Sequence, residues 1–81
     1  MHIDAKNWND RLRDLRVDHD ISQAFIADML GTSQSYYSKY ELGKHQIPIE
    51  HLVKLCRFYG ISADFILGLP AGLAYPGVTR P

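Results

Sequence analysis

The chain has 81 residues, 46% of them hydrophobic, which fits one small domain with a thin core and no second domain. Nine Lys/Arg balance nine Asp/Glu, so the formal net charge is zero, which excludes the strongly basic coat of a nonspecific nucleic-acid binder. The single Cys56 cannot form an internal disulfide, and neither a signal peptide nor an apolar run near the roughly 20 residues of a membrane span is present, so we expect a cytoplasmic protein without a membrane partner.

The first predicted helix covers residues 5 to about 18. Trp8, Leu12 and Leu15 recur at spacings of four and three residues, which puts them on one apolar stripe. Asp4 is the expected N-cap. The chain must then turn near Asp20, a residue type that tolerates left-handed backbone better than most.

Two short helices joined by a tight turn are predicted next, at about residues 23–30 and 34–41. Ser22 and Ser33 are good N-caps, and Gly31 suits the turn because a positive φ costs glycine little. The inward candidates of the first helix are Ala24, Ile26, Ala27 and Leu30. This is the layout of a helix-turn-helix, whose second helix fits the DNA major groove.

The remaining elements are two further helices and a tail. Pro48 suits the first turn of a helix that ends at Gly60, with an apolar stripe of Leu52, Leu55, Cys56 and Tyr59. A last helix at about residues 63–67, capped by Ser62, should point Phe65 and Ile66 at the core. We therefore expect an all-α DNA-binding domain at 1–68, followed by an irregular, dimer-forming or disordered tail at 69–81, where three of the four prolines lie.

Residues 11–69 resemble the Cro and phage-repressor class of helix-turn-helix proteins, the XRE-type family of bacteria and their phages. The matching segments are, in order, RLRDLR, ISQAFIADMLGTSQSYYSKYELGK and IPIEHLVKLCRFYGISADFILGL. The resemblance implies a compact five-helix bundle of the lambda-repressor-like type that binds double-stranded DNA, usually as a two-fold homodimer. It also implies a phosphate contact for Gln23, a DNA-backbone contact for Lys44, and a buried ion pair between Arg16 and Glu41.

The outward face of the second motif helix supplies the expected base contacts. Tyr37 and Tyr40, three residues apart, should face inward, which turns the polar residues outward. Gln34 can pair bidentately with adenine and Lys39 can reach guanine. Tyr36 stands where a small residue is commoner in the family that the chain resembles, and it can stack on a sugar, touch a thymine methyl or partly block the groove. The expected base-contacting set is Gln34, Ser35, Tyr36, Ser38 and Lys39.

The expected DNA-backbone contacts are Gln23, Ser33, Lys44 and His45. Gln23 and Ser33 lie at helix N-termini, where backbone N–H groups already favour an anion. Lys44 and His45 lie in the loop that follows the second motif helix. The alternative for each of these polar side chains, and for Arg16 and Glu41, is a solvated surface residue without a partner.

Enzymatic and metal-binding functions have little support in the sequence. The four histidines and Cys56 lack metal-ligand spacing, and no glycine-rich phosphate loop or nucleophile elbow is present, so we expect no metal, cofactor, small-molecule substrate or catalysis. The expected function is a sequence-specific transcriptional regulator, a repressor that binds an inverted repeat as a dimer. The alternative is an antitoxin or adaptor whose main partner is another protein, favoured by the zero net charge, exposed Phe25 and Tyr36, and the apolar tail.

Overall fold

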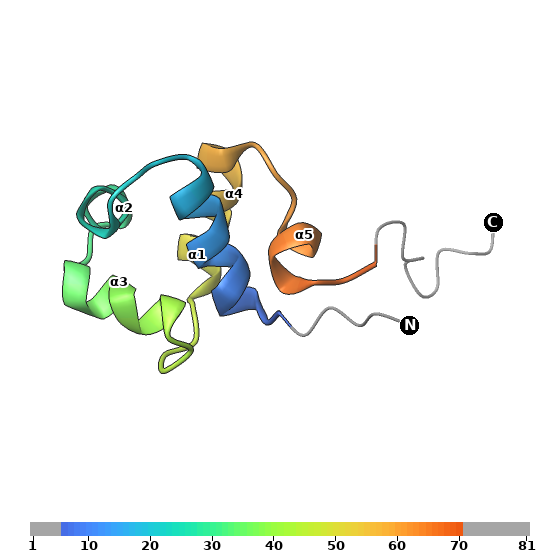
Figure 1. Cartoon of the computed structure of the whole chain (residues 1–81), viewed down its shortest axis with the longest axis horizontal. Coiled ribbons are helices and arrows are strands. Elements are labelled where there is room, and N and C mark those ends of the chain that lie inside the picture. The colour runs from blue at the N-terminus through green and yellow to red at the C-terminus, as the bar shows by residue number, and fades with distance from the viewer. Residues whose placement is uncertain (1–5, 71–81) are drawn as a thin grey trace.

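The computed structural model describes residues 6–70, and these form five helices, which confirms the predicted all-α bundle (Figure 1). The helices are α1 (Trp8–Asp18), α2 (Gln23–Leu30), α3 (Gln34–Glu41), α4 (Ile49–Tyr59) and α5 (Ala63–Leu67). Helices α2 and α3 lie together at the left of Figure 1, α1 and α4 occupy the middle, and α5 packs against both α1 and α4. None of the helices in this part of the chain is long and apolar enough to cross a membrane.

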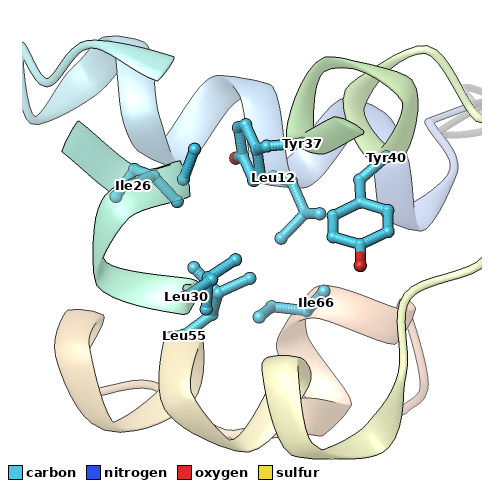
Figure 2. Close-up of a cluster of buried hydrophobic side chains, with 8 residues drawn as sticks. Leu12, Ile26, Leu30, Tyr37, Tyr40, Leu55 and Ile66 are labelled. Atoms are coloured by element: carbon cyan, nitrogen blue, oxygen red, sulfur yellow. The ribbon is translucent and has the colours of Figure 1, made fainter. Parts of the chain in front are cut away.

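The core takes buried side chains from all five helices (Figure 2). Its members are Leu12, Ile26, Ala27, Leu30, Tyr37, Tyr40, Leu55 and Ile66. A fully buried aliphatic or aromatic side chain stabilises the fold by about 1.5–3 kcal/mol, so this small cluster carries much of the folding free energy. Tyr37 and Tyr40 bury the inner face of α3, as their spacing predicts, and this packing fixes which face of α3 remains outside.

Local sequence signals fix the helix ends around α2 and α3. The Ser22 Oγ accepts a hydrogen bond from the Phe25 N–H at 3.1 Å, and the Ser33 Oγ accepts one from the Tyr36 N–H at 3.1 Å. Gly31 ends α2 with a φ of 77°, in the left-handed region that glycine enters at little cost. Asp20 turns the chain between α1 and α2 with a φ of 60°, as its residue type allows.

Two predictions about helix starts were wrong. Helix α1 begins at Trp8 instead of residue 5, because Asn7 caps it in a capping box with Asp10, whose Oδ2 accepts the Asn7 N–H at 3.1 Å. Asp4, the expected cap, lies outside the described residues. Pro48 is the N-cap of α4 and not a residue of its first turn, since its ψ of 150° is extended.

Two predictions about core residues were also wrong. Ala24 is exposed, because it lies on a different face of α2 from Ile26, Ala27 and Leu30, which reach the core. Phe65 is 54% exposed while the neighbouring Ile66 is fully buried, because a helix of five residues can turn only one side inward. Of the predicted tail, only Leu69 and Pro70 lie within the described residues, and both are exposed.

Candidate nucleic-acid interface

Helix α3 presents a polar face to solvent opposite its buried tyrosines. The side chains of Gln34, Ser35, Tyr36 and Lys39 are exposed, and that of Ser38 is half-buried. The one acidic residue of α3, Glu41, is buried at its end. The outer face of this helix therefore carries one positive charge and no negative charge, together with hydrogen-bonding groups of the kind that read base edges.

A buried ion pair holds α3 against α1. The Arg16 Nε lies 2.7 Å from Glu41 Oε2, and the Arg16 Nη2 donates to Glu41 Oε1 at 3.0 Å, so the sequence-predicted partners are in contact. Arg16 Nη1 also donates to the Ile21 carbonyl at 2.9 Å. Burial alone would raise the pKa of Glu41, but the hydrogen bonds from Arg16 and other neighbours outweigh it and lower the pKa below its ordinary value.

Gln23 belongs to the same buried network, a link that the sequence did not reveal. Its Nε2 donates to Glu41 Oε1 at 3.1 Å. An amide nitrogen has two N–H donors, so one remains for another acceptor. The N-terminus of α2 is thereby joined to the end of α3 through a single carboxylate. Asn9 on α1 adds a further tie, since its Nδ2 donates to the Glu41 backbone carbonyl at 3.1 Å.

The loop after α3 folds back onto that helix. The backbone N–H groups of Lys44 and His45 both donate to the Lys39 carbonyl, at 2.9 Å and 3.3 Å. The Lys44 side chain is exposed and His45 is half-buried. Lys44 and His45 therefore lie beside the C-terminal end of α3, whereas Gln23 and Ser33, which are also predicted to meet the DNA backbone, lie at the N-termini of α2 and α3.

An aromatic cluster extends from the outer face of α3 into the protein. The Tyr36 ring lies 5.0 Å from the His45 ring, with 34° between their planes, and 5.6 Å from the Tyr40 ring, nearly edge to face at 78°. The Tyr40 hydroxyl is 2.9 Å from His51 Nδ1 on α4. Sequence reasoning missed the contacts of both histidines, because nothing in the local pattern predicts which ring of α3 a residue of the following loop or helix will contact.

The amino-acid sequence is similar to those of known transcriptional regulators. A family model described as helix-turn-helix matches residues 12–66. The chain is 41% identical over 59 residues to YobD, an uncharacterized HTH-type transcriptional regulator of Bacillus subtilis, covering 73% of this chain and 53% of the relative. It is 35% identical over 54 residues to RstR, the cryptic phage CTXphi transcriptional repressor of Vibrio cholerae, covering 67% and 49%. The chain thus spans about half the length of these curated relatives.

Solved structures share the fold. The P22 c2 repressor, in a crystal structure with a synthetic operator, aligns with a TM-score of 0.71 at 27% identity, covering 78% of this chain and 96% of that one. A transcriptional regulator from Listeria innocua aligns with a TM-score of 0.76 at 22% identity, covering 84% and 64%, a likeness of fold alone. With the family model spanning more than half of the sequence, the chain belongs to the helix-turn-helix family, in its Cro and phage-repressor class.

Proposed function

We propose that the chain is a sequence-specific DNA-binding transcriptional regulator that places α3 in the major groove. The observation that carries this proposal is the outer face of α3, which combines Lys39, amide and hydroxyl groups with no negative charge, while the inner face is fixed by packing. The P22 c2 repressor, whose structure was solved with an operator, has the same fold, which supports the same use of this helix.

The proposed base contacts follow from donor and acceptor chemistry. Gln34 pairs bidentately with adenine N6 and N7, and Lys39 donates to guanine O6 and N7. Ser35 and Ser38 can donate to or accept from either a base or a phosphate. Tyr36 completes the base-contacting set.

The proposed backbone contacts surround this helix. The second amide N–H of Gln23 donates to a phosphate while the first remains on Glu41. Ser33 acts through the N-terminus of α3, because its hydroxyl already caps the helix. Lys44, whose side chain is exposed, approaches the backbone from the loop beyond α3. Each phosphate neutralised by a cation adds about 0.9 to the slope of log affinity against log salt.

We further propose that two copies bind an inverted repeat and repress by occupying a promoter. In this arrangement the α3 helices of the two copies enter successive major grooves about 34 Å apart, which is roughly 10 base pairs between half-site centres. The exposed apolar residues Leu67 and Leu69, at and after the end of α5, support a contact between copies, since each is more than 40% exposed in the single chain.

Selection from a random pool of DNA duplexes tests this function. Enriched duplexes are measured by fluorescence anisotropy at two salt concentrations, with wild type and a Gln34→Ala/Lys39→Ala double variant. The matched control is Lys54→Ala, which removes an exposed lysine from α4 and is expected to leave sequence preference unchanged. Enrichment of an inverted repeat that the double variant no longer prefers supports the proposal. A folded wild-type protein that enriches no sequence contradicts it.

A protein partner, as for an antitoxin or adaptor, is the second candidate function. Phe25 on α2 and Phe58 on α4 are 54% and 41% exposed, with ring centroids 6.0 Å apart, and they border a shallow hollow of about 470 Å³ together with Asp20, Ile21 and Ser22. Such a hollow fits an apolar side chain of another protein.

The salt dependence of binding distinguishes the two candidate functions, because DNA affinity falls steeply as the salt concentration rises and the affinity of an apolar interface does not. Phe58→Ser should abolish partner binding and spare the operator.

A further inference from the structure

The exposed ring of Tyr36 is held in place on the outer face of α3. It is 43% exposed, yet the His45 ring lies beside it at 5.0 Å and the Tyr40 ring meets it at 5.6 Å. Tyr40 is itself fully buried and contacts His51 on α4 through its hydroxyl, at 2.9 Å. A surface tyrosine with such neighbours cannot fold away from an approaching surface without giving up two favourable ring contacts.

The chemistry of the major groove limits what a fixed ring can read there. Base edges in this groove present hydrogen-bond donors, acceptors and one apolar group, the C5 methyl of thymine. A tyrosine ring offers a large apolar surface, and its hydroxyl is its only polar group. On the same face, the side chains of Gln34 and Lys39 supply the hydrogen-bond reading. The ring therefore supplies the kind of contact that the other residues of α3 lack.

We propose that Tyr36 is a specificity-determining residue that selects a thymine by packing against its methyl group, and that His45 is a positioning residue that holds the Tyr36 ring. This inference rests on the proposed function, since it names the base that one residue on the outer face of α3 recognises. It departs from the sequence-based assignment of His45 to the DNA backbone.

The placement of His45 supports a positioning role. Its ring is half-buried against Tyr36, and its backbone N–H is hydrogen-bonded to the Lys39 carbonyl at 3.3 Å, which anchors the loop to the end of α3. The neighbouring Lys44 is exposed and donates its backbone N–H to the same carbonyl at 2.9 Å. Lys44 is thus free to meet a phosphate, whereas moving the His45 ring to a phosphate would break its contact with Tyr36.

Replacing thymine by uracil tests the proposal, because this change removes only the C5 methyl. The operator selected by the wild-type protein is synthesised with each thymine replaced in turn, symmetrically in both half-sites, and affinities are compared with those of the unmodified duplex. Burial of one methyl-sized group is worth about 0.8 kcal/mol, so one thymine per half-site is expected to show a loss of about fourfold per methyl.

Four variants show which side chains cause the loss of affinity that follows removal of the thymine methyl. Tyr36→Ala should bind the thymine and uracil duplexes equally, and Tyr36→Phe should keep the wild-type preference, because the ring and not the hydroxyl makes the contact. His45→Ala should lose at least half of the preference on a logarithmic scale, whereas His45→Phe should keep it, since phenylalanine can stack but cannot bind a phosphate. Gln34→Ala is the matched control, expected to lower overall affinity while leaving this preference intact. Circular dichroism and urea unfolding check that each variant folds.

Several outcomes overturn the inference while leaving the proposed function standing. They are a selected operator in which no thymine methyl contributes, a Tyr36→Ala protein that keeps the wild-type preference, and a Tyr36→Phe protein that loses it. The positioning role of His45 is overturned if His45→Ala keeps the full preference or if His45→Phe loses as much of it as His45→Ala does. Failure of the wild-type protein to select any operator is a different result, which overturns the proposed function and this inference together.

Discussion

Arg16 and Glu41 meet through two hydrogen bonds between α1 and the end of α3, at 2.7 Å and 3.0 Å. The Glu41 side chain is 3% exposed and that of Arg16 is 15% exposed. Gln23, the first residue of α2, donates to the same carboxylate at 3.1 Å. The first three helices therefore share one buried carboxylate, and the orientation of α3 depends on a residue that lies on its buried side.

Glu41→Ala is expected to lower the free energy of unfolding by about 3 kcal/mol, because it leaves the Arg16 guanidinium largely buried without its partner. The change should also weaken operator binding by misorienting α3, although Glu41 is buried and faces no base. Urea unfolding and anisotropy measure the two effects. Glu50→Ala, which removes an exposed glutamate from the first turn of α4, should cost less than about 1 kcal/mol. A Glu41→Ala protein with wild-type stability and affinity would contradict the structural role.

The same pair predicts how stability depends on pH. Burial raises the pKa of Glu41, but the hydrogen bonds from Arg16 and its other neighbours together outweigh this effect and hold the pKa below its ordinary 4.5 in the folded protein. The unfolded chain then binds the proton more tightly than the folded one. The contribution of Glu41 to stability is therefore fully present above the unfolded pKa and is lost as the pH falls through the folded pKa.

Urea unfolding at a series of pH values tests this expectation against Glu41→Gln, which keeps the shape of the side chain but cannot ionise. As the pH falls through 4.5, the ordinary pKa that Glu41 has in the unfolded chain, the stability of the wild type should fall more steeply than that of the variant. The other carboxylates titrate in both proteins, so the difference between the two curves isolates Glu41. Parallel curves would show that Glu41 has the same pKa in the folded and unfolded chains.

The sequence predicted the helix-turn-helix well because its signals are local. Ser22, Gly31 and Ser33 each act within one helical turn, so they define the ends of α2 and α3 without knowledge of the rest of the fold. The spacing of Tyr37 and Tyr40 likewise identifies the buried side of α3, and with it the outer face.

The parts that could not be predicted depend on how distant segments meet. Gln23 and Glu41 are 18 residues apart, and their hydrogen bond follows from the packing of α2 on α3. The stacking of His45 on Tyr36 depends on the path of a loop, for which the sequence has no periodic signal. The sequence wrongly predicts Phe65 in the core, because hydrophobicity alone cannot say which side of a five-residue helix faces inward.

The turn between α2 and α3 is expected to tolerate asparagine better than alanine at Gly31. A Cβ added there meets no described atom within 4 Å, so the cost of a substitution is backbone strain from the φ of 77° and not a clash. Gly31→Ala should lower the free energy of unfolding by about 1–2 kcal/mol. Gly31→Asn should cost less, because asparagine enters the left-handed region more readily. Urea unfolding at pH 7 measures both, and an alanine variant at least as stable as the asparagine variant would contradict the assignment of strain.

Tyr59→Phe and Tyr40→Phe are expected to change stability in opposite directions, although both remove one hydroxyl. The Tyr59 hydroxyl is buried without a hydrogen-bond partner among residues 6–70, and burial raises the pKa of this group to about 12. Its removal relieves an unsatisfied buried group and should stabilise the protein by up to about 1 kcal/mol. The Tyr40 hydroxyl lies 2.9 Å from His51 Nδ1, so its removal should cost about 1 kcal/mol.

A double-mutant cycle tests whether the stability lost in Tyr40→Phe comes from its hydrogen bond with His51. Tyr40→Phe and His51→Ala, alone and combined, should show a coupling energy near 1 kcal/mol in urea unfolding, whereas Tyr59→Phe combined with His51→Ala should be additive. A loss for Tyr59→Phe as large as that for Tyr40→Phe would mean that the Tyr59 hydroxyl has a partner in solution. Tyr40 also contacts the Tyr36 ring. Operator affinity measured on the same variants therefore shows whether losing the contact between Tyr40 and His51 changes DNA binding by the outer face of α3.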